Sequence, residues 1–284
     1  MRDSSSDTER PTTAPSGSVI SVRGDSVERR EDRLVGEEPL EIRVCGPRQK
    51  PVPVAVTMRT PGSEAELATG FLVTEGLIGA DDVLGFTGGD PERMAQPDNE
   101  MTVRLRRRFD ASKVAGRAFV ATASCGICGK ASVDGIAVRC ARLPEGPLLP
   151  RSVLEGLPEQ MREAQRVFQR TGGLHAAALF EPDGALVELR EDIGRHNALD
   201  KLVGAMALAG RLPLHGKVLL VSGRVSFEIA QKAAVAGVPI LAAISAPSDL
   251  AVVTAARLGM TLIGFLRDDG FNVYCGEERL DLGS

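Results

Sequence analysis

Helical segments and short apolar runs alternate through the C-terminal part of the chain, and this pattern constrains the fold more than any other feature. Each of three helical patterns ends at a glycine and is followed by an apolar run: 197–209 by 218–221, 227–236 by 238–244, and 249–258 by 260–265. Strands that are apolar throughout and separated by helices indicate a parallel sheet covered on both faces. Residues 272–275 are expected to add an edge strand, so this half is predicted to be α/β.

The preceding part of the chain is predicted to be rich in strands. Alternating or extended apolar patterns predict strands at 40–44, 52–58, 101–106 and 118–122, with a loop at 88–99. Ser63 and Glu66 have the spacing of a capping box, which predicts that a short helix begins there. This half is therefore β-rich with at least one helix.

A proline-rich segment at 143–150 is predicted to link the two halves. A helical stretch follows from Ser152 and ends at Gly172-Gly173. Next comes a predicted hairpin with strands at 175–180 and 185–189. The expected division is a β-rich N-terminal domain at 37–149 and an α/β domain at 150–284. The fold class of the whole chain is therefore expected to be α/β, or α+β when both domains are counted.

Residues 1–36 consist mainly of Ser, Thr, Pro, Arg and acidic residues. Such a segment cannot bury enough apolar surface to offset its ordering entropy, so we expect a mostly disordered tail. The alternative is a charged arm that docks on a partner.

Composition argues against several classes of protein. The 284 residues have a formal net charge of −4, no Trp and one Tyr, which argues against nucleic-acid binding. No apolar run approaches the roughly 20 residues that span a bilayer, and the N-terminus has no apolar core of a secretory signal. Five cysteines, an odd number, fit a reducing cytoplasm better than a disulfide framework. We therefore expect a cytoplasmic protein.

The pair Cys125 and Cys128 is the first candidate site, in the stretch CGICGK after a predicted strand. Two thiols at this spacing can share a metal, form a disulfide or pass a sulfur atom between them. Flanking glycines expose the sulfurs, and Lys130 favours the reactive thiolate. The alternative is a pair of small buried residues.

Zinc and redox roles for this pair are also open. Structural zinc needs four ligands, and only Cys140 lies near as a third. A thioredoxin-like role would place the pair at a helix N-terminus, whereas its flanks here are typical of a loop. We therefore expect no metal. Cys45, Cys140 and Cys275 have no partner at a recognisable spacing and are expected to be structural.

The second candidate site is EDIGRHN at 191–197, just before a predicted helix. Arg195 and His196 would lie beside free backbone N–H groups, which suit a phosphate or another anion. Asn197 is a candidate N-cap, and Asp200 suits the first turn electrostatically. In the alternative interpretation, His196 only bonds the local backbone.

Three polar loops each follow one of the predicted parallel strands: 222–226, 245–249 and 267–270. Open α/β sheets bind ligands outside the carboxyl ends of their strands, which predicts a crevice for a phosphorylated or other polar ligand. Ser and Asp at these positions are also ordinary helix caps. The Arg104–Arg108 cluster is expected to be a solvated face, or else to recognise an acidic partner.

Taken together, these stretches resemble the formate dehydrogenase accessory sulfurtransferase family. The resemblance runs from about Glu38 to the C-terminus and rests on SCGICGK at 124–130, EDIGRHNALDKLVG at 191–204, SGRVSFEIAQKAA at 222–234, VPILAAISAPSDLAV at 238–252 and GFLRDDGFNVY at 264–274.

The resemblance implies a sulfur carrier that takes persulfide sulfur from a cysteine desulfurase. Its acceptor would be the molybdenum (or tungsten) centre of a bis(pterin guanine dinucleotide) cofactor, bound as a client and destined for formate dehydrogenase. Cys125 would carry the persulfide and Cys128 would assist. The residues implied to hold the cofactor are Phe265, Leu266, Arg267, Asp268, Asp269 and Gly270. The family also implies a cytidine deaminase-like α/β/α C-terminal domain and a homodimer.

Two rival functions compete with this interpretation. Zinc deaminases also use Cys-x-x-Cys, but they require His-x-Glu and a proline before the first cysteine. No histidine here is followed by Glu two positions on, and Ser124 precedes Cys125, so the sequence argues against deaminase chemistry. The other rival is a non-enzymatic chaperone that binds the cofactor or the apo-enzyme, with incidental cysteines.

Overall fold

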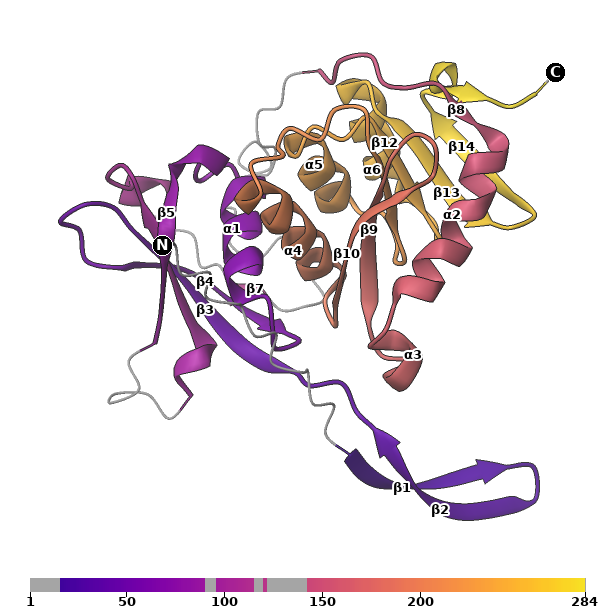
Figure 1. Ribbon diagram of the computed structural model, residues 1–284, viewed down its shortest axis with the longest axis horizontal. Helices are drawn as coiled ribbons and strands as arrows, with labels where there is room; N and C mark the ends of the chain where they lie inside the picture. The colour runs from indigo at the N-terminus through magenta and orange to yellow at the C-terminus, as the bar shows by residue number, and fades with distance from the viewer. Residues whose placement is uncertain (1–15, 90–95, 115–119, 122–141, 284) are drawn as a thin grey trace, which may run out of the picture.

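The computed structural model describes residues 16–89, 96–114, 120–121 and 142–283, and its main elements form two sheets with helices between and beside them (Figure 1). The elements are β1 (Ser16–Arg23), β2 (Ser26–Arg33), β3 (Glu38–Cys45), β4 (Val52–Arg59), α1 (Glu64–Thr74), β5 (Val83–Gly88), β6 (Glu100–Leu105), β7 (Val120–Ala121), β8 (Leu149–Pro150), α2 (Arg151–Ala164), α3 (Phe168–Thr171), β9 (His175–Phe180), β10 (Leu186–Asp192), α4 (Arg195–Leu208), β11 (Val218–Val221), α5 (Phe227–Val235), β12 (Ile240–Ala243), α6 (Asp249–Leu258), β13 (Thr261–Arg267), β14 (Gly270–Cys275) and β15 (Leu280–Asp281). Short 3₁₀ helices lie at Ala80–Asp82, Pro97–Asn99, Ala111–Lys113 and Glu277–Arg279. The expectation of a mixed α/β fold is confirmed.

The larger sheet has six strands in the order β10-β9-β11-β12-β13-β14. Only the central neighbours, β11-β12 and β12-β13, pair in parallel. The β10-β9, β9-β11 and β13-β14 pairs are antiparallel. The expected parallel sheet is therefore the centre of a mixed one. The chain reverses direction between β13 and β14 through a tight turn, so β14 lies antiparallel at the edge, where an edge strand was predicted.

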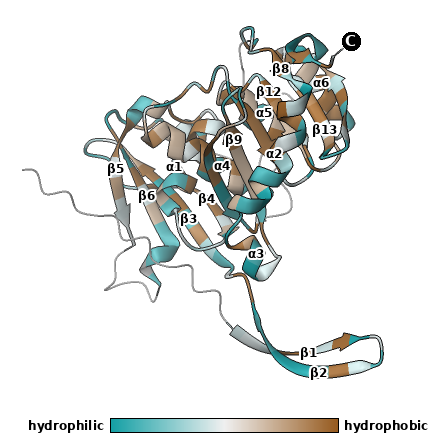
Figure 2. Cartoon of the chain, turned by 45° about the vertical axis from the view of Figure 1, so that its right-hand side comes forward, coloured by the Kyte–Doolittle hydropathy of each residue, from teal (hydrophilic) through white to brown (hydrophobic). Residues whose placement is uncertain are grey.

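Both faces of this sheet are covered. On one face, Leu154, Leu157 and Met161 of α2 pack against alternate residues of the central strands. On the other face, α4, α5 and α6 bury the intervening residues, such as Leu219, Leu241 and Leu262. Figure 2 shows the resulting distribution of hydropathy, with brown strands inside the molecule and teal segments along α2.

The smaller sheet has five strands in the order β5-β6-β3-β4-β7. It packs against α1, which lies directly beside α4 (Figure 1). Gly70 on α1 and Gly204 on α4 make this contact possible: a Cβ on Gly70 would overlap the carbonyl of Asp200, and one on Gly204 would overlap the carbonyl of Glu66. The two helices therefore touch backbone to backbone.

One continuous core joins the two halves, and a second cluster lies between α2 and the larger sheet. The continuous core runs from Leu40 and Val103 of the smaller sheet, through Leu72 of α1 and Leu199 of α4, to Leu241 of the larger sheet. Each sheet takes its strands from one side of the expected boundary near residue 149, but the two halves share their apolar interior.

The expected disorder of residues 1–36 is wrong for the part that the structure describes. Residues 16–33 form an antiparallel hairpin, β1-β2, that projects away from the two sheets (Figure 1). Its two-residue loop is Gly24-Asp25, with Gly24 at φ 56°, and loops of this kind are typical of hairpins. β-branched Val19, Ile20 and Val22 favour the extended chain. The hairpin signal was therefore present, but the polar composition obscured it.

Two local predictions are also corrected. The helical stretch before Gly172 is two helices, α2 and α3, and α3 ends where Gly172 adopts φ 68°. Ser63 precedes α1 with a left-handed backbone (φ 60°), whereas a capping serine has an extended one, and its side chain makes no capping bond. Glu66 instead forms a two-point ion pair with Arg190, at 2.6 and 2.8 Å.

Candidate functional site

The polar loops of the larger sheet gather at one edge. β11, β12 and β13 are parallel, so their carboxyl ends meet there. β9 runs antiparallel to β11, which brings His175 and the end of β10 to the same edge. The predicted gathering of the three loops at one edge agrees with this topology, and the structure adds segment 191–197, which was predicted as a separate site.

Backbone hydrogen bonds tie the loops to each other. Val225 N donates to Ala246 O at 3.1 Å, and Ser248 N donates to Val225 O at 2.8 Å. Ser222 Oγ accepts from Ala176 N at 2.9 Å. Ser248 also caps α6 through Ala251 N, as the ordinary interpretation of these residues predicts. Hydrogen bonds therefore connect the loops at 222–226 and 245–249 to each other and to the start of β9.

The segment 265–270 lies at the end of β13 and turns into β14. Phe265 has φ 53° and an exposed ring, and its N–H donates to Ser245 O at 3.2 Å. A positive φ is uncommon for such a residue and is held here by the surrounding structure. Gly264 before it has no room for a side chain, since a Cβ would lie 2.8 Å from Pro247 Cδ and 2.9 Å from Tyr274 Cε2.

The remaining side chains of this segment differ in what they can contact. Leu266 is fully buried in the core, so only its backbone faces the edge. Arg267, Asp268 and Asp269 are exposed. Arg267 Nη1 donates to Ile244 O at 2.5 Å and to Leu266 O at 3.0 Å, which anchors the guanidinium across two strand ends. Its other N–H groups remain available to an anion.

Arg195 and His196 begin α4, whose N-cap is Gly194. His196 Nε2 lies 3.3 Å from Ser226 Oγ at the start of α5, so the two helix N-termini meet at this pair. Gly223 leaves space that a Cβ would fill, 3.3 Å from His175 Nδ1 and 3.4 Å from Arg195 Cδ. His196 therefore contacts another loop of the edge instead of only its own backbone.

His175 and His196 both have a lowered pKa, which favours the neutral imidazole at pH 7. Burial lowers the pKa of His196 to about 3, and the positive charges of Lys232 and Arg195 add to the effect. Burial and then Arg195 also lower the pKa of His175. The positive charge at this edge therefore comes from arginine, and the imidazoles offer neutral hydrogen-bonding groups.

Asn197 is not the N-cap of α4. Its Nδ2 donates to Met58 O at 2.7 Å and to Asp192 Oδ1 at 3.1 Å, which fastens α4 to β4 of the smaller sheet. Asp192 is fully buried and also accepts from Thr60 N and Gly194 N, at 3.1 and 2.8 Å. Lys201 Nζ lies 2.7 Å from Asp192 Oδ2 and completes this cluster.

Asp200, expected to complement the helix dipole, instead pairs with Lys232 of α5 beneath the edge. Lys232 Nζ lies 2.9 Å from both carboxylate oxygens of Asp200 and 2.8 Å from Thr74 Oγ1. The ammonium also lies 3.3 Å from Glu75 Oε1 and over the ring of Phe71. Lys232 was not among the residues predicted to be functional. A lysine within the otherwise apolar helix FEIAQKAAV is the sequence feature that could have indicated a buried ion pair.

Cys125 and Cys128 lie outside the described residues, as does Cys140. The last described residue before them is Ala121, whose backbone pairs with Thr57 of β4. Thr57 Oγ1 in turn donates to Asn197 Oδ1 at 3.2 Å. Ala121, the last described residue before Cys125, therefore pairs with a strand residue that contacts the start of α4.

The two described cysteines, Cys45 and Cys275, are both free thiols. Cys275 Sγ donates to Met260 O at 3.3 Å, and burial raises the pKa of its thiol. Within the described ranges, no three His, Cys, Asp or Glu side chains are arranged to hold a metal ion. No helix in that part of the chain is long and apolar enough to cross a membrane.

The fold and this edge define an α/β protein whose polar loops meet where open sheets bind ligands. Comparison with known proteins then places it: residues 35–281 match the model of the FdhD/NarQ family, and the chain belongs to that family. Its relatives include the sulfur carrier protein FdhD of Streptomyces avermitilis, 50% identical over 271 residues, which cover 93% of this chain and 94% of the relative. The sulfur carrier protein FdhD of Mycobacterium tuberculosis is 48% identical, with 92% of this chain and 96% of the relative covered.

Among solved structures, a formate dehydrogenase accessory protein from Desulfotalea psychrophila has a similar fold. The TM-score is 0.69 at 20% sequence identity, and the match covers 94% of this chain and 99% of the other. The resemblance stated from the motifs is confirmed by these comparisons.

Proposed function

We propose that this protein carries sulfur as a persulfide on Cys125 and delivers it to the molybdenum centre of a pterin guanine dinucleotide cofactor destined for formate dehydrogenase. The observation that carries the proposal is the match to the family over residues 35–281, a range that contains Cys125 and Cys128. Relatives of about 50% identity are named sulfur carriers, and a protein with this fold is described as a formate dehydrogenase accessory protein.

The loading step is a thiol exchange. The Cys125 thiolate attacks the outer sulfur of a cysteine desulfurase persulfide, the S–S bond breaks, and the desulfurase cysteine leaves as a thiolate. One sulfur atom moves with no net change in oxidation state, and Cys125 becomes the persulfide. An exposed cysteine with a depressed pKa favours this step.

Delivery as sulfide needs two electrons, and Cys128 can supply them. Its thiolate attacks the inner sulfur of the Cys125 persulfide, a Cys125–Cys128 disulfide forms, and the outer sulfur leaves as HS⁻ for the metal. A cellular dithiol then reduces the disulfide. This balance gives Cys128 the assisting role that the family resemblance implies.

The cofactor is the substrate of this reaction, and segment 265–270 fits its nucleotide end. The exposed ring of Phe265 offers a face for a planar base, and Arg267 presents guanidinium N–H groups to a phosphate. Leu266 is buried, so its contribution is limited to the backbone. Arg195 and the N-termini of α4 and α5 lie at the same sheet edge and suit further phosphate oxygens.

The chain between Ala121 and Cys125 limits how far the thiol can lie from the smaller sheet. Cys125 is four positions beyond Ala121, so the chain between them spans at most about 14 Å. Ala121 pairs with Thr57, and Thr57 contacts Asn197 at the start of α4. In this proposal, the persulfide and the cofactor meet at one edge of the molecule. The protein is further proposed to be cytoplasmic and to form a homodimer.

Complementation tests the cysteine. In a host without its own carrier of this family, wild type is expected to restore formate dehydrogenase activity and Cys125→Ala is not. Cys45→Ala is the matched control and should restore full activity. Full restoration by Cys125→Ala would refute sulfur transfer through Cys125 and favour a non-enzymatic chaperone.

Nucleotide binding tests the edge. Arg267→Ala should weaken binding of a guanine nucleotide about tenfold, the loss expected for one charge-assisted phosphate contact. Arg30→Ala, in the projecting hairpin, is the control and should leave the dissociation constant unchanged. Equal effects of the two changes would remove segment 265–270 from the proposed site.

A further inference from the structure

A second surface lies at the opposite end of the smaller sheet. β3 and β6 are parallel and end there, and β4 begins there, because it is antiparallel to β3. Two connecting segments, 46–51 and 106–109, therefore lie side by side. β7 runs parallel to β4 and pairs with its later half, so this end is remote from the point where the chain continues to Cys125.

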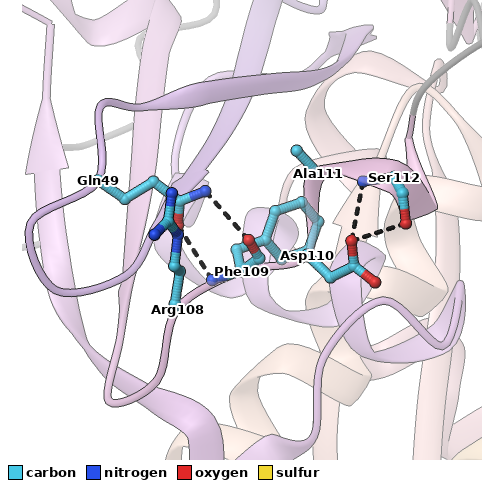
Figure 3. Close-up of a pocket in the computed structure, with 6 residues that line it drawn as sticks. All are labelled: Gln49, Arg108, Phe109, Asp110, Ala111 and Ser112. Carbon is cyan, nitrogen blue, oxygen red and sulfur yellow. Dashed lines mark hydrogen bonds between the residues drawn. The ribbon is translucent and has the colours of Figure 1, made fainter.

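The two segments are locked together. A Cβ on Gly46 would overlap the backbone of Arg107 and Arg108, so only glycine permits this approach. Gln49 bridges the segments: Oε1 accepts from Phe109 N at 3.0 Å, and Nε2 donates to Phe109 O at 3.0 Å (Figure 3). Phe109 is buried and anchors the pair to the core. The surface is therefore preformed.

This surface carries concentrated positive charge. Segments 46–51 and 106–109 together contain five basic residues and no acidic residue, and we call the five the basic rim: Arg48, Lys50, Arg106, Arg107 and Arg108. All five are exposed. Arg106 Nε donates to Asp81 O, and within the described part of the chain no rim residue forms an ion pair. A chain with a net charge of −4 thus keeps a locally positive surface.

A depression of about 450 Å³ adjoins the rim, lined by Gln49, Arg108, Phe109, Asp110, Ala111 and Ser112. In Figure 3, the side chain of Arg108 lies beside that of Gln49 at one end of it. Asp110 at the other end accepts hydrogen bonds from Ser112 N and Ser112 Oγ, at 3.0 and 2.6 Å. These bonds orient its carboxylate toward its own loop. Those two hydrogen bonds keep the pKa of Asp110 below its usual value.

We propose that the basic rim is a docking surface for an acidic segment of a partner protein. Guanidinium groups bind carboxylates in a two-point geometry, and three adjacent arginines offer several such contacts. Single-stranded nucleic acids are bound with aromatic stacking as well as charge, and Phe109, the aromatic residue of the rim segments, is buried. The docking surface does not depend on sulfur transfer through Cys125.

Fluorescence anisotropy with a labelled oligoglutamate peptide tests this surface. The triple variant Arg106→Gln, Arg107→Gln, Arg108→Gln is expected to bind about tenfold more weakly than wild type, because each exposed ion pair is individually weak and three are lost together. The matched control is Arg151→Gln, Arg162→Gln, Arg166→Gln on and after α2, which removes the same charge from another exposed surface. Binding by this control should equal that of wild type, and added salt should weaken both.

Three results would overturn the proposal. One is the absence of peptide binding by wild type, and another is an equal loss in both triple variants. The third is tighter, rim-dependent binding of a single-stranded oligonucleotide or of phosphatidylserine vesicles than of the peptide, which would assign the rim to a nucleic acid or a membrane surface. Retained circular dichroism of the rim variant verifies that it is folded, as expected for exposed side chains.

Discussion

Asp192, the last residue of β10, and Lys201 on α4 form a buried ion pair, with Lys201 Nζ 2.7 Å from Asp192 Oδ2. Both residues also bind the end of β4: Asp192 accepts from Thr60 N, and Lys201 donates to Thr60 O at 2.8 Å. The pair therefore joins the two sheets directly behind the candidate binding edge.

Lys201→Met is expected to destabilise the protein by about 3–5 kcal/mol, because it leaves the Asp192 charge buried without its partner. Urea unfolding measures this loss. The control is Lys217→Met, which breaks a half-exposed pair with Glu181 and should cost less than about 1 kcal/mol. Similar losses in the two variants would show that the buried pair contributes no more than a surface one.

The contact between α1 and α4 makes a second prediction. Gly204→Ala should destabilise the protein by about 1–3 kcal/mol, because the added methyl group overlaps the carbonyl of Glu66 and separates the helices. Gly156→Ala on α2 is the control, since nothing lies within 4 Å of the position that its methyl group would take. It should stabilise by about 0.5–1 kcal/mol through helix propensity. Thermal unfolding checks this prediction: the melting temperature should fall for Gly204→Ala and rise for Gly156→Ala.

Stability is predicted to fall as the pH decreases below about 6.5, partly because of His196. Its folded-state pKa of about 3 lies below the ordinary value of 6.5, so between these values the unfolded state binds the extra proton. From about pH 7.5 to about pH 5.5, this one group removes about 1.4 kcal/mol of stability.

Urea unfolding at the two pH values checks this contribution. Between the two pH values, the free energy of unfolding of His196→Gln should decrease by about 1.4 kcal/mol less than that of wild type. This difference does not depend on how stable the variant is at the higher pH. His215→Gln, in the loop before β11, should retain the full decrease. An unchanged pH dependence in His196→Gln would mean that His196 titrates normally in the folded protein.

The elements of the larger sheet were predictable because they are local patterns. The bounds of β11 and α6 agree with the apolar run at 218–221 and the helical pattern at 249–258, which ends at Gly259 with φ 69°. The β1-β2 hairpin was missed because its few apolar residues gave weak periodicity, although Gly24-Asp25 marked the turn.

The interactions behind the candidate site were not predictable, because they join residues far apart in the sequence. Thr60 and Asp192 are 132 positions apart, and Thr74 and Lys232 are 158 positions apart. Topology alone predicted one edge for the loops at 222–226, 245–249 and 267–270, whereas Arg195 and His196 were expected to form a separate site. No sequence pattern showed that Leu266 faces the core or that Asn197 fastens α4 to β4.

The central claim, sulfur transfer through Cys125, is tested most directly by the intact mass of the protein after incubation with a cysteine desulfurase and cysteine. Wild type and Cys45→Ala are expected to gain the mass of one sulfur atom, which a thiol reductant then removes. Cys125→Ala is expected to gain none. A reducible sulfur that Cys125→Ala still acquires in full, or its absence from wild type, would contradict the account.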